Sequence, residues 1–210
     1  MRLALALALF ASAPALASGS GPGTGYGVPE TGDGTISLLG GLRLIPFNGA
    51  YTDETHGTHR LLEPGAIASF GYQFDEELHF KIDLGYGTDK YTNPDLVVRS
   101  VQLLLGVDTA LFKRSWCTVY GGGGLGYSLN TGSRDGQDIE ANSYALYLQL
   151  GWRIRLTDNL AFVLEDRYTM ASAQVDPTTA TKLSVGGNLL SVGLMVHFNQ
   201  PDDKGHPQAP

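Results

Sequence analysis

The chain has a single cysteine, Cys117, among its 210 residues, and it is poor in positive charge. An intrachain disulfide is therefore excluded, and we interpret Cys117 as a small apolar residue of a strand. The 14 Lys and Arg residues against 21 Asp and Glu give a net charge of -7, and they form no basic run. Nucleic-acid binding needs clustered positive charge to neutralise phosphates, so this class of partner is excluded.

Long apolar runs are also missing beyond the N-terminus. A membrane-spanning helix would need a run of about 20 apolar residues. The sequence begins MRLALALALFASAPALA, in which Arg2 precedes an apolar run that ends at Phe10, and small residues follow up to Ala17. This layout is typical of a cleavable secretory signal. The alternative is a membrane-anchoring helix, but the run is too short for one. We predict that residues 1–17 are a signal peptide and that the chain is exported.

Two further segments cannot supply a hydrophobic core. Residues 18–34 are rich in Gly, Pro, Ser and Thr, and residues 199–210 form a polar tail. Such compositions are typical of flexible segments. The chain is short enough for one domain, which we place at residues 35–198.

Within this domain, apolar residues recur at every second position. Such alternation is typical of strands that have one apolar face. We count eight runs, at about 36–47, 61–74, 78–91, 96–112, 116–130, 143–156, 160–174 and 187–198. Each is long enough to cross a bilayer as a tilted strand, which takes about 9–11 residues. In the last run, one face carries Leu190, Val192, Leu194, Val196 and Phe198.

The lengths of the connections distinguish a membrane barrel from a soluble sandwich. Short links at 75–77, 113–115 and 157–159 alternate with longer polar segments at 48–60, 87–95, 130–142 and 174–187. Short turns on one side and long loops on the other are typical of outer-membrane barrels. An even number of strands then places both chain ends on the short-turn side, in the periplasm.

Two segments also carry a resemblance to a known family. The seventh run contains LAFVLEDRYT at 160–169, with an acidic residue before an Arg-Tyr pair, and the last run ends at Phe198. In these segments and in its layout, the chain resembles the small eight-stranded outer-membrane barrels of the outer-membrane-protein-A and opacity-protein type.

The resemblance implies an all-β, antiparallel, up-and-down transmembrane barrel. It also implies that the barrel-assembly machinery reads the closing strand, through Leu194, Val196 and Phe198. The chain departs from the family in the polar tail that follows Phe198. This tail is far too short for a peptidoglycan-binding domain.

If the apolar faces contact lipid, the opposite faces bring charged residues into the lumen. An eight-stranded barrel has an interior just wide enough to be filled by side chains. Either the charges form a plug of ion pairs, or they line a narrow ion path. We favour the plug, because unpaired buried charges cost several kcal/mol each. The predicted network consists of Arg43, Lys81, Asp83, Asp108, Arg153, Glu165 and Arg167. Asp166 breaks the pattern on the lipid-facing side, where we expect a bulge or a position at the membrane rim.

No metal or cofactor site is predicted. The segment 48–60 contains His56 and His59, but an H-x-x-H spacing on a loop lacks the fixed geometry of a zinc site. The glycine run 121–126 lacks the Lys and Ser/Thr of a phosphate-binding loop. We expect it to let the sheet curve or to make room for bulky lumen side chains.

The function predicted from the sequence is that of a structural outer-membrane barrel. It would contact membrane lipids, and its loops would serve adhesion, surface integrity or an extracellular ligand. One alternative is an enzyme that modifies lipid A or acyl chains, although no Ser forms a motif with the strand histidines His79 and His197. The other is a soluble lipocalin-type barrel that binds a ligand.

Overall fold

The computed structural model describes residues 32–44, 63–75, 77–92, 95–134, 137–157, 159–176, 181–184 and 186–198. The predicted signal peptide, the polar tail, His56 and His59 lie outside these ranges, as does nearly all of the predicted leader. Within the described ranges, no helix has the length and hydropathy needed to span a bilayer. The described residues form the strands β1 (Gly34–Leu44), β2 (Glu63–Gln73), β3 (Leu78–Thr92), β4 (Asp95–Arg114), β5 (Cys117–Arg134), β6 (Gln137–Arg155), β7 (Leu160–Asp176), β8 (Thr181–Ser184) and β9 (Gly187–Phe198).

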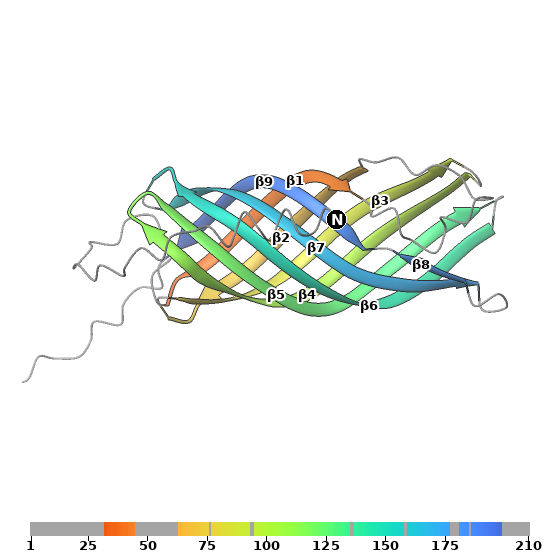
Figure 1. The fold of residues 1–210 in the computed structure, drawn as a ribbon, viewed down its shortest axis with the longest axis horizontal. Coiled ribbons are helices and arrows are strands. Elements are labelled where there is room, and N and C mark those ends of the chain that lie inside the picture. The colour runs from red at the N-terminus through yellow and green to blue at the C-terminus, as the bar shows by residue number, and fades with distance from the viewer. Residues whose placement is uncertain are drawn as a thin grey trace, which may run out of the picture.

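Eight of these nine strands close into a barrel of tilted antiparallel strands (Figure 1). Strands β1 to β7 pair in chain order, and β9 closes the wall by pairing with both β1 and β7. The predicted eight-stranded up-and-down barrel is confirmed. The four-residue strand β8 was not predicted, and it pairs with the end of β7.

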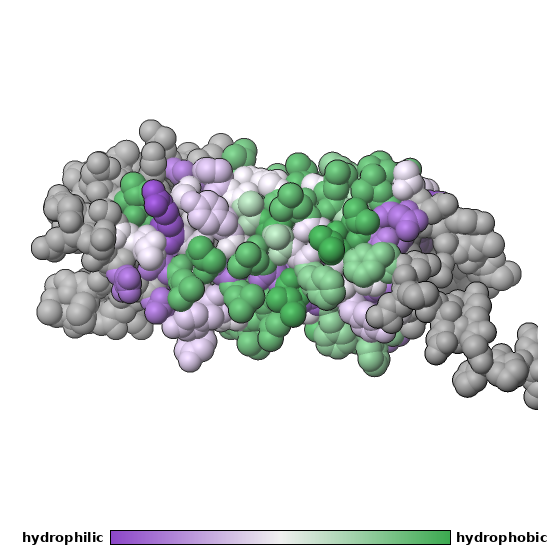
Figure 2. Space-filling view, turned by 180° about the vertical axis from the view of Figure 1, so that it is seen from behind, coloured by the Kyte–Doolittle hydropathy of each residue, from purple (hydrophilic) through white to green (hydrophobic). Residues whose placement is uncertain are grey.

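The two faces of the wall alternate as the sequence pattern predicts. On β9, Leu194, Val196 and Phe198 are 48%, 47% and 39% exposed, whereas the intervening Met195 and His197 are buried. Figure 2 shows the result on one side of the barrel, where hydrophobic residues gather across the middle of the outer surface. An apolar exterior suits a lipid environment and is the reverse of what a soluble barrel presents to water. The lipocalin-type alternative therefore finds no support in the structure.

The short turns all lie at one end of the barrel, which we call the turn end. They join β2 to β3, β4 to β5 and β6 to β7, and Gly34 pairs with Phe198 at the same end. In the first turn, the Asp75 carboxylate accepts hydrogen bonds from the backbone N–H groups of Glu77 and Leu78, at 2.8 and 2.7 Å. Both hydrogen bonds stabilise the ionised carboxylate and so lower the pKa of Asp75 from its ordinary value of 3.8. The bond from Glu77 has the larger effect.

At the opposite end, here called the hairpin end, two predicted loops prove to be strands. β3 continues to Thr92 before β4 starts at Asp95, and β5 continues to Arg134 before β6 starts at Gln137. The predicted loops 87–95 and 130–142 are therefore wrong over most of their length. Their residues are polar on both faces, so alternation could not identify them. The paired backbones nevertheless satisfy each other's hydrogen bonds.

Of the two explanations expected for Asp166, a bulge or a position at the membrane rim, the bulge is wrong. The register of β7 runs without interruption through Asp166 against both β6 and β9. The irregularities lie between Ala110 and Phe112 and between Gln174 and Asp176. Asp166 keeps its place in the alternation and points outward.

The abundant glycines make room for two large lumen side chains. A Cβ added to Gly106 would lie 1.7 Å from Tyr147 Oη, and one added to Gly124 would lie 2.6 Å from Tyr147 Cε1. A Cβ added to Gly151 would lie 2.5 Å from the Tyr120 ring. The expected role of the glycine run, space for bulky lumen side chains, is therefore seen at Gly124.

Candidate functional site

The inward positions of the strands gather charged side chains in the barrel interior. All seven residues predicted from the sequence are at most 7% exposed. Six of them, here called the lumen network, lie close together: Lys81 and Asp83 on β3, Asp108 on β4, Arg153 on β6, and Glu165 and Arg167 on β7.

Arg167 anchors the part of the network nearer the hairpin end. Its Nη2 lies 2.7 Å from Asp83 Oδ2 and 2.9 Å from Glu165 Oε1. The guanidinium also stacks over the ring of Tyr147, 4.4 Å from its centroid, and the Tyr147 hydroxyl donates to Asp83 at 3.3 Å. Asp83 thus receives a charge and a hydroxyl from different strands, which offsets part of the cost of burying it.

Asp108 anchors the part nearer the turn end. Its Oδ2 accepts a hydrogen bond from Arg153 Nη2 at 2.8 Å, and its Oδ1 accepts one from the Gln149 amide. Gln149 in turn accepts a hydrogen bond from Lys81 Nζ at 2.7 Å.

Lys81 joins the two parts. Its Nζ lies 3.6 Å from Asp83 Oδ2, 3.6 Å from Asp108 Oδ1 and 3.5 Å from Glu165 Oε2. One cation thus contacts three carboxylates from three strands. Because the network holds three cations and three carboxylates, its formal charge is zero. Such a balance suits a low-dielectric interior.

Two of these contacts cross the full width of the barrel. In the wall order β1-β2-β3-β4-β5-β6-β7-β9, three strands separate β3 from β7 in either direction. The Lys81–Glu165 and Asp83–Arg167 ion pairs therefore join opposite walls. Sequence alternation could predict that these side chains face inward, but it carried no information on which ones meet.

Sequence reasoning missed Tyr120 and the role of Tyr147. The Tyr120 hydroxyl donates to Glu165 Oε2 at 2.8 Å, and the Arg153 guanidinium lies over the Tyr120 ring, 4.1 Å from its centroid. Both tyrosines occupy inward positions in the alternation, opposite glycines on neighbouring strands. A tyrosine at an inward position opposite a glycine was therefore the sequence signal that could have identified both residues.

His79 forms an unexpected chain with Thr35 and Asp108. Thr35 Oγ1 lies 2.8 Å from His79 Nε2, and His79 Nδ1 lies 3.4 Å from Asp108 Oδ2. The order hydroxyl, imidazole, carboxylate is that of a nucleophilic triad. All three side chains are buried, however, and the cavity that they line is about 10 Å³, which is room for one water molecule. The chain can satisfy buried polar groups, but the cavity has no room for a substrate.

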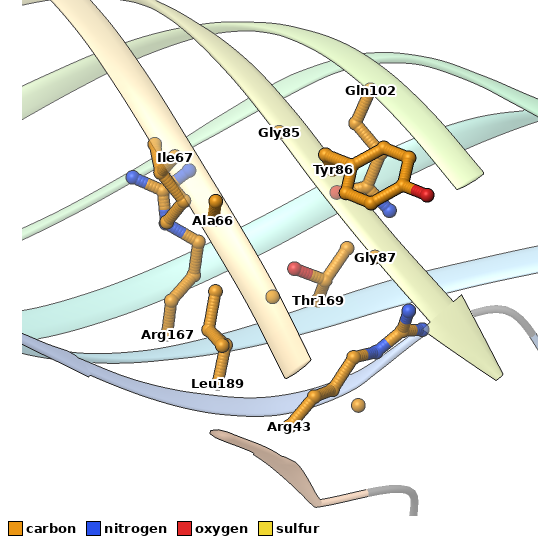
Figure 3. Close-up of a pocket in the computed structure, with 12 residues that line it drawn as sticks. Arg43, Ala66, Ile67, Gly85, Tyr86, Gly87, Gln102, Arg167, Thr169 and Leu189 are labelled. Carbon is orange, nitrogen blue, oxygen red and sulfur yellow. The ribbon is translucent and has the colours of Figure 1, made fainter. Parts of the chain in front are cut away.

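Arg43 lies nearer the hairpin end than the lumen network. Its Nη2 donates to the carbonyl of Gly186 at 2.8 Å. Arg43 and Arg167 line a cavity of about 30 Å³ together with Gln102 and Thr169. Figure 3 shows the two guanidinium groups pointing to different sides of this cavity.

The remaining candidate residues are placed as follows. Cys117 is buried at the start of β5. His197 lies at the turn end, with its Nδ1 3.7 Å from Asp33 Oδ2. The described residues contain no group of three or more His, Cys, Asp or Glu side chains that could hold a metal ion.

Comparison with known proteins places this geometry in a family. The model of the family described as outer membrane protein beta-barrel domain matches residues 3–198. No curated protein matches the chain in sequence. Among solved structures, neisserial surface protein A is 18% identical with a TM-score of 0.57, and the similarity covers 81% of this chain and 100% of that one. OprG from Pseudomonas aeruginosa is 12% identical with a TM-score of 0.61, covering 81% and 98%.

The N-terminal barrel of Pseudomonas aeruginosa OprF is 13% identical with a TM-score of 0.54, covering 81% of this chain and 100% of that one. At these identities the neighbours show the fold, which is that of small outer-membrane barrels. The chain therefore belongs to the outer membrane protein beta-barrel domain family and is an eight-stranded bacterial outer-membrane barrel.

Proposed function

We propose that this barrel has a structural and surface-contact role, and that the lumen network closes its interior to solutes. The proposal rests on the two ion pairs that cross the lumen. Lys81 lies 3.5 Å from Glu165, and Arg167 lies 2.7 Å from Asp83. Side chains from opposite walls meet at the centre of the bore, where a permeating solute would have to pass.

The energetics of buried charge support closure. An ion that passed would have to separate these pairs, and removing one partner of a buried ion pair costs about 3–5 kcal/mol. The hydrogen bonds from Tyr120 and Tyr147 to the same carboxylates would be lost as well.

The hairpin end supports a role in surface contacts. On β4 to β6, the outward residues change from apolar to polar toward this end, where Arg99, Thr131, Glu140 and Asn142 are exposed. The strands thus continue past the apolar band and present polar hairpins to the medium. If the turn end faces the periplasm, as we propose together with the cleaved signal peptide, these hairpins lie outside the cell.

A liposome-swelling assay tests closure directly. Vesicles that carry the wild-type barrel should swell in isotonic arabinose no faster than protein-free vesicles. A Lys81→Ala/Arg167→Ala variant removes one partner from each crossing pair and serves as the comparison. Wild-type swelling at the rate of a general porin would overturn the proposal.

The alternative of a lipid-modifying enzyme rests on the Thr35–His79–Asp108 chain. Mass spectrometry of lipid A from cells with and without the protein discriminates it. We expect identical spectra, because the cavity beside Thr35 holds no more than a water molecule.

A further inference from the structure

The cavity that Arg43 and Arg167 line lies on the hairpin side of the lumen network. Along β3, Gly85 and Gly87 take the two inward positions that follow Asp83 toward the hairpin end. On β2, the register partner of Gly87 is a third glycine, Gly65. None of these residues has a side chain, so the wall recedes at three neighbouring inward positions. This leaves the space of about 30 Å³.

Hydrogen-bond donors line this cavity. Its inward polar side chains are those of Arg43 on β1, Gln102 on β4, and Arg167 and Thr169 on β7. Among the described residues that line it, none carries a carboxylate. In Figure 3, the Thr169 side chain lies between the two guanidinium groups. A guanidinium can only donate hydrogen bonds, and a hydroxyl or an amide can donate one as well. The lining therefore offers donors from three strands to a ligand that accepts.

The two guanidinium groups are deeply buried, although they carry charge. Arg43 and Arg167 are 7% and 2% exposed. Arg167 Nε donates to Glu165 Oε1 at 3.0 Å, whereas its Nη1 is buried and has no hydrogen-bond partner among the described residues. A buried donor without a partner is costly. An acceptor bound in the cavity would supply the missing partner.

The charges that face the cavity favour an anion. They are the guanidinium groups of Arg43 and Arg167, and only Arg167 belongs to the lumen network, whose formal charge is zero. The register partner of Arg43 is Glu63 on β2, which is buried but does not line the cavity. Its carboxylate reduces the positive potential around Arg43 without occupying the space. A ligand in the cavity thus meets positive charge first, and Glu63 limits its affinity.

We propose that this cavity binds one small monovalent anion, of the size of chloride, beside Arg43, Thr169 and Arg167. One water molecule needs about 10–15 Å³ of such space, so the cavity holds a solute of about two water molecules and has no room for the four oxygens of phosphate or sulfate. A chloride accepts charge-assisted hydrogen bonds from the guanidinium groups, which a neutral solute cannot match. The ion lies on the hairpin side of the network, so the site does not depend on closure of the lumen.

Chloride NMR of the full-length barrel in uncharged detergent micelles tests the site, with sodium chloride as the probe. Wild type should broaden the chloride signal beyond empty micelles, because a bound chloride relaxes faster. Bromide should reverse this broadening, and sulfate at equal ionic strength should not. Arg43→Gln should weaken binding about tenfold, the factor that corresponds to one charge-assisted hydrogen bond. Glu63→Gln removes the neighbouring negative charge and should strengthen binding.

Gly87→Ala tests the space without changing any charge. Its Cβ would lie 3.0 Å from Arg43 Nη1, so the cavity narrows and chloride binding should weaken. Arg99→Gln is the matched control, because it removes an exposed, outward arginine near the same end of the barrel, and its broadening should equal that of wild type. Heat-modifiable gel migration establishes that each variant is folded.

Four results would overturn the proposal. The first is a wild-type barrel that broadens the chloride signal no more than empty micelles do. The second is unchanged broadening in Arg43→Gln, and the third is an equal loss in Arg99→Gln, which would assign the effect to net charge. The fourth is full competition by sulfate, because the cavity is too small for that ion.

Discussion

Lys81→Met removes the cation that contacts all three carboxylates of the lumen network while keeping an unbranched side chain of similar volume. Asp83, Asp108 and Glu165 would then face only Arg153 and Arg167, and the buried network would carry one uncompensated negative charge. Removing one partner of a buried ion pair costs about 3–5 kcal/mol. We expect the free energy of unfolding to fall by about this amount.

A double-mutant cycle combines Lys81→Met with a second substitution, Glu165→Gln. In Lys81→Met/Glu165→Gln, the pairs Asp83–Arg167 and Asp108–Arg153 remain one to one, and a glutamine can still accept the Tyr120 hydroxyl. The double variant should therefore recover about 2 kcal/mol relative to Lys81→Met, within the range seen for coupled contacts.

Urea unfolding in lipid vesicles, followed by tryptophan fluorescence and gel mobility, measures both values. The control is Lys113→Met, which removes an exposed lysine at the turn end and should change stability by no more than about 0.5 kcal/mol. A loss below about 1 kcal/mol in Lys81→Met, or a double variant that is the sum of its singles, would refute the reasoning about charge balance.

Three further predictions address other parts of the chain. Gly106→Ala places a Cβ 1.7 Å from the Tyr147 hydroxyl and should lower the free energy of unfolding in urea by about 1–3 kcal/mol. The control Gly40→Ala, whose Cβ would meet nothing within 4 Å, should leave that free energy unchanged, and equal effects of the two variants would contradict the packing argument. Phe198→Ala should leave refolding in detergent unchanged but lower the heat-modifiable fraction in cell membranes after a pulse label; unaltered assembly would dismiss the closing-strand signal. Hydrogen bonds, above all from the backbone N–H of Glu77, lower the pKa of Asp75, so its stabilising effect is present above pH 3.8 and is lost as pH falls through the folded value. The difference in unfolding midpoint between wild type and Asp75→Ala should therefore shrink in acid, and a constant difference would contradict it.

Sequence alternation was enough to predict the barrel wall wherever one face meets lipid. The run 187–198 coincides with β9 because large apolar residues mark every outward position from Leu190 onward. Alternation could not identify the strand residues at 87–95 and 130–142, because there the strands continue past the apolar band and the sequence is mostly polar at successive positions. There, only the pairing with a neighbouring strand distinguishes a strand from a loop.

The sequence predicted which residues make up the lumen network but not which of them contact each other. Alternation showed that Lys81 and Glu165 face inward, but their contact depends on closure of the barrel, which brings distant strands opposite each other. The contact between Thr35 and His79 has the same origin, and Gly71 makes it possible because a Cβ there would lie 2.3 Å from His79 Nε2. The sequence pattern also identified Asp166 as an exception, but of the two explanations that we gave, a bulge or a position at the membrane rim, the bulge was wrong.

Single-channel recording in planar bilayers is the most direct test of the central claim, that ion pairs between β3 and β7 close the lumen. The wild-type barrel should show no large, stable conductance, and Lys81→Ala/Arg167→Ala should conduct more than wild type. Stable porin-sized steps from the wild-type protein would contradict the account.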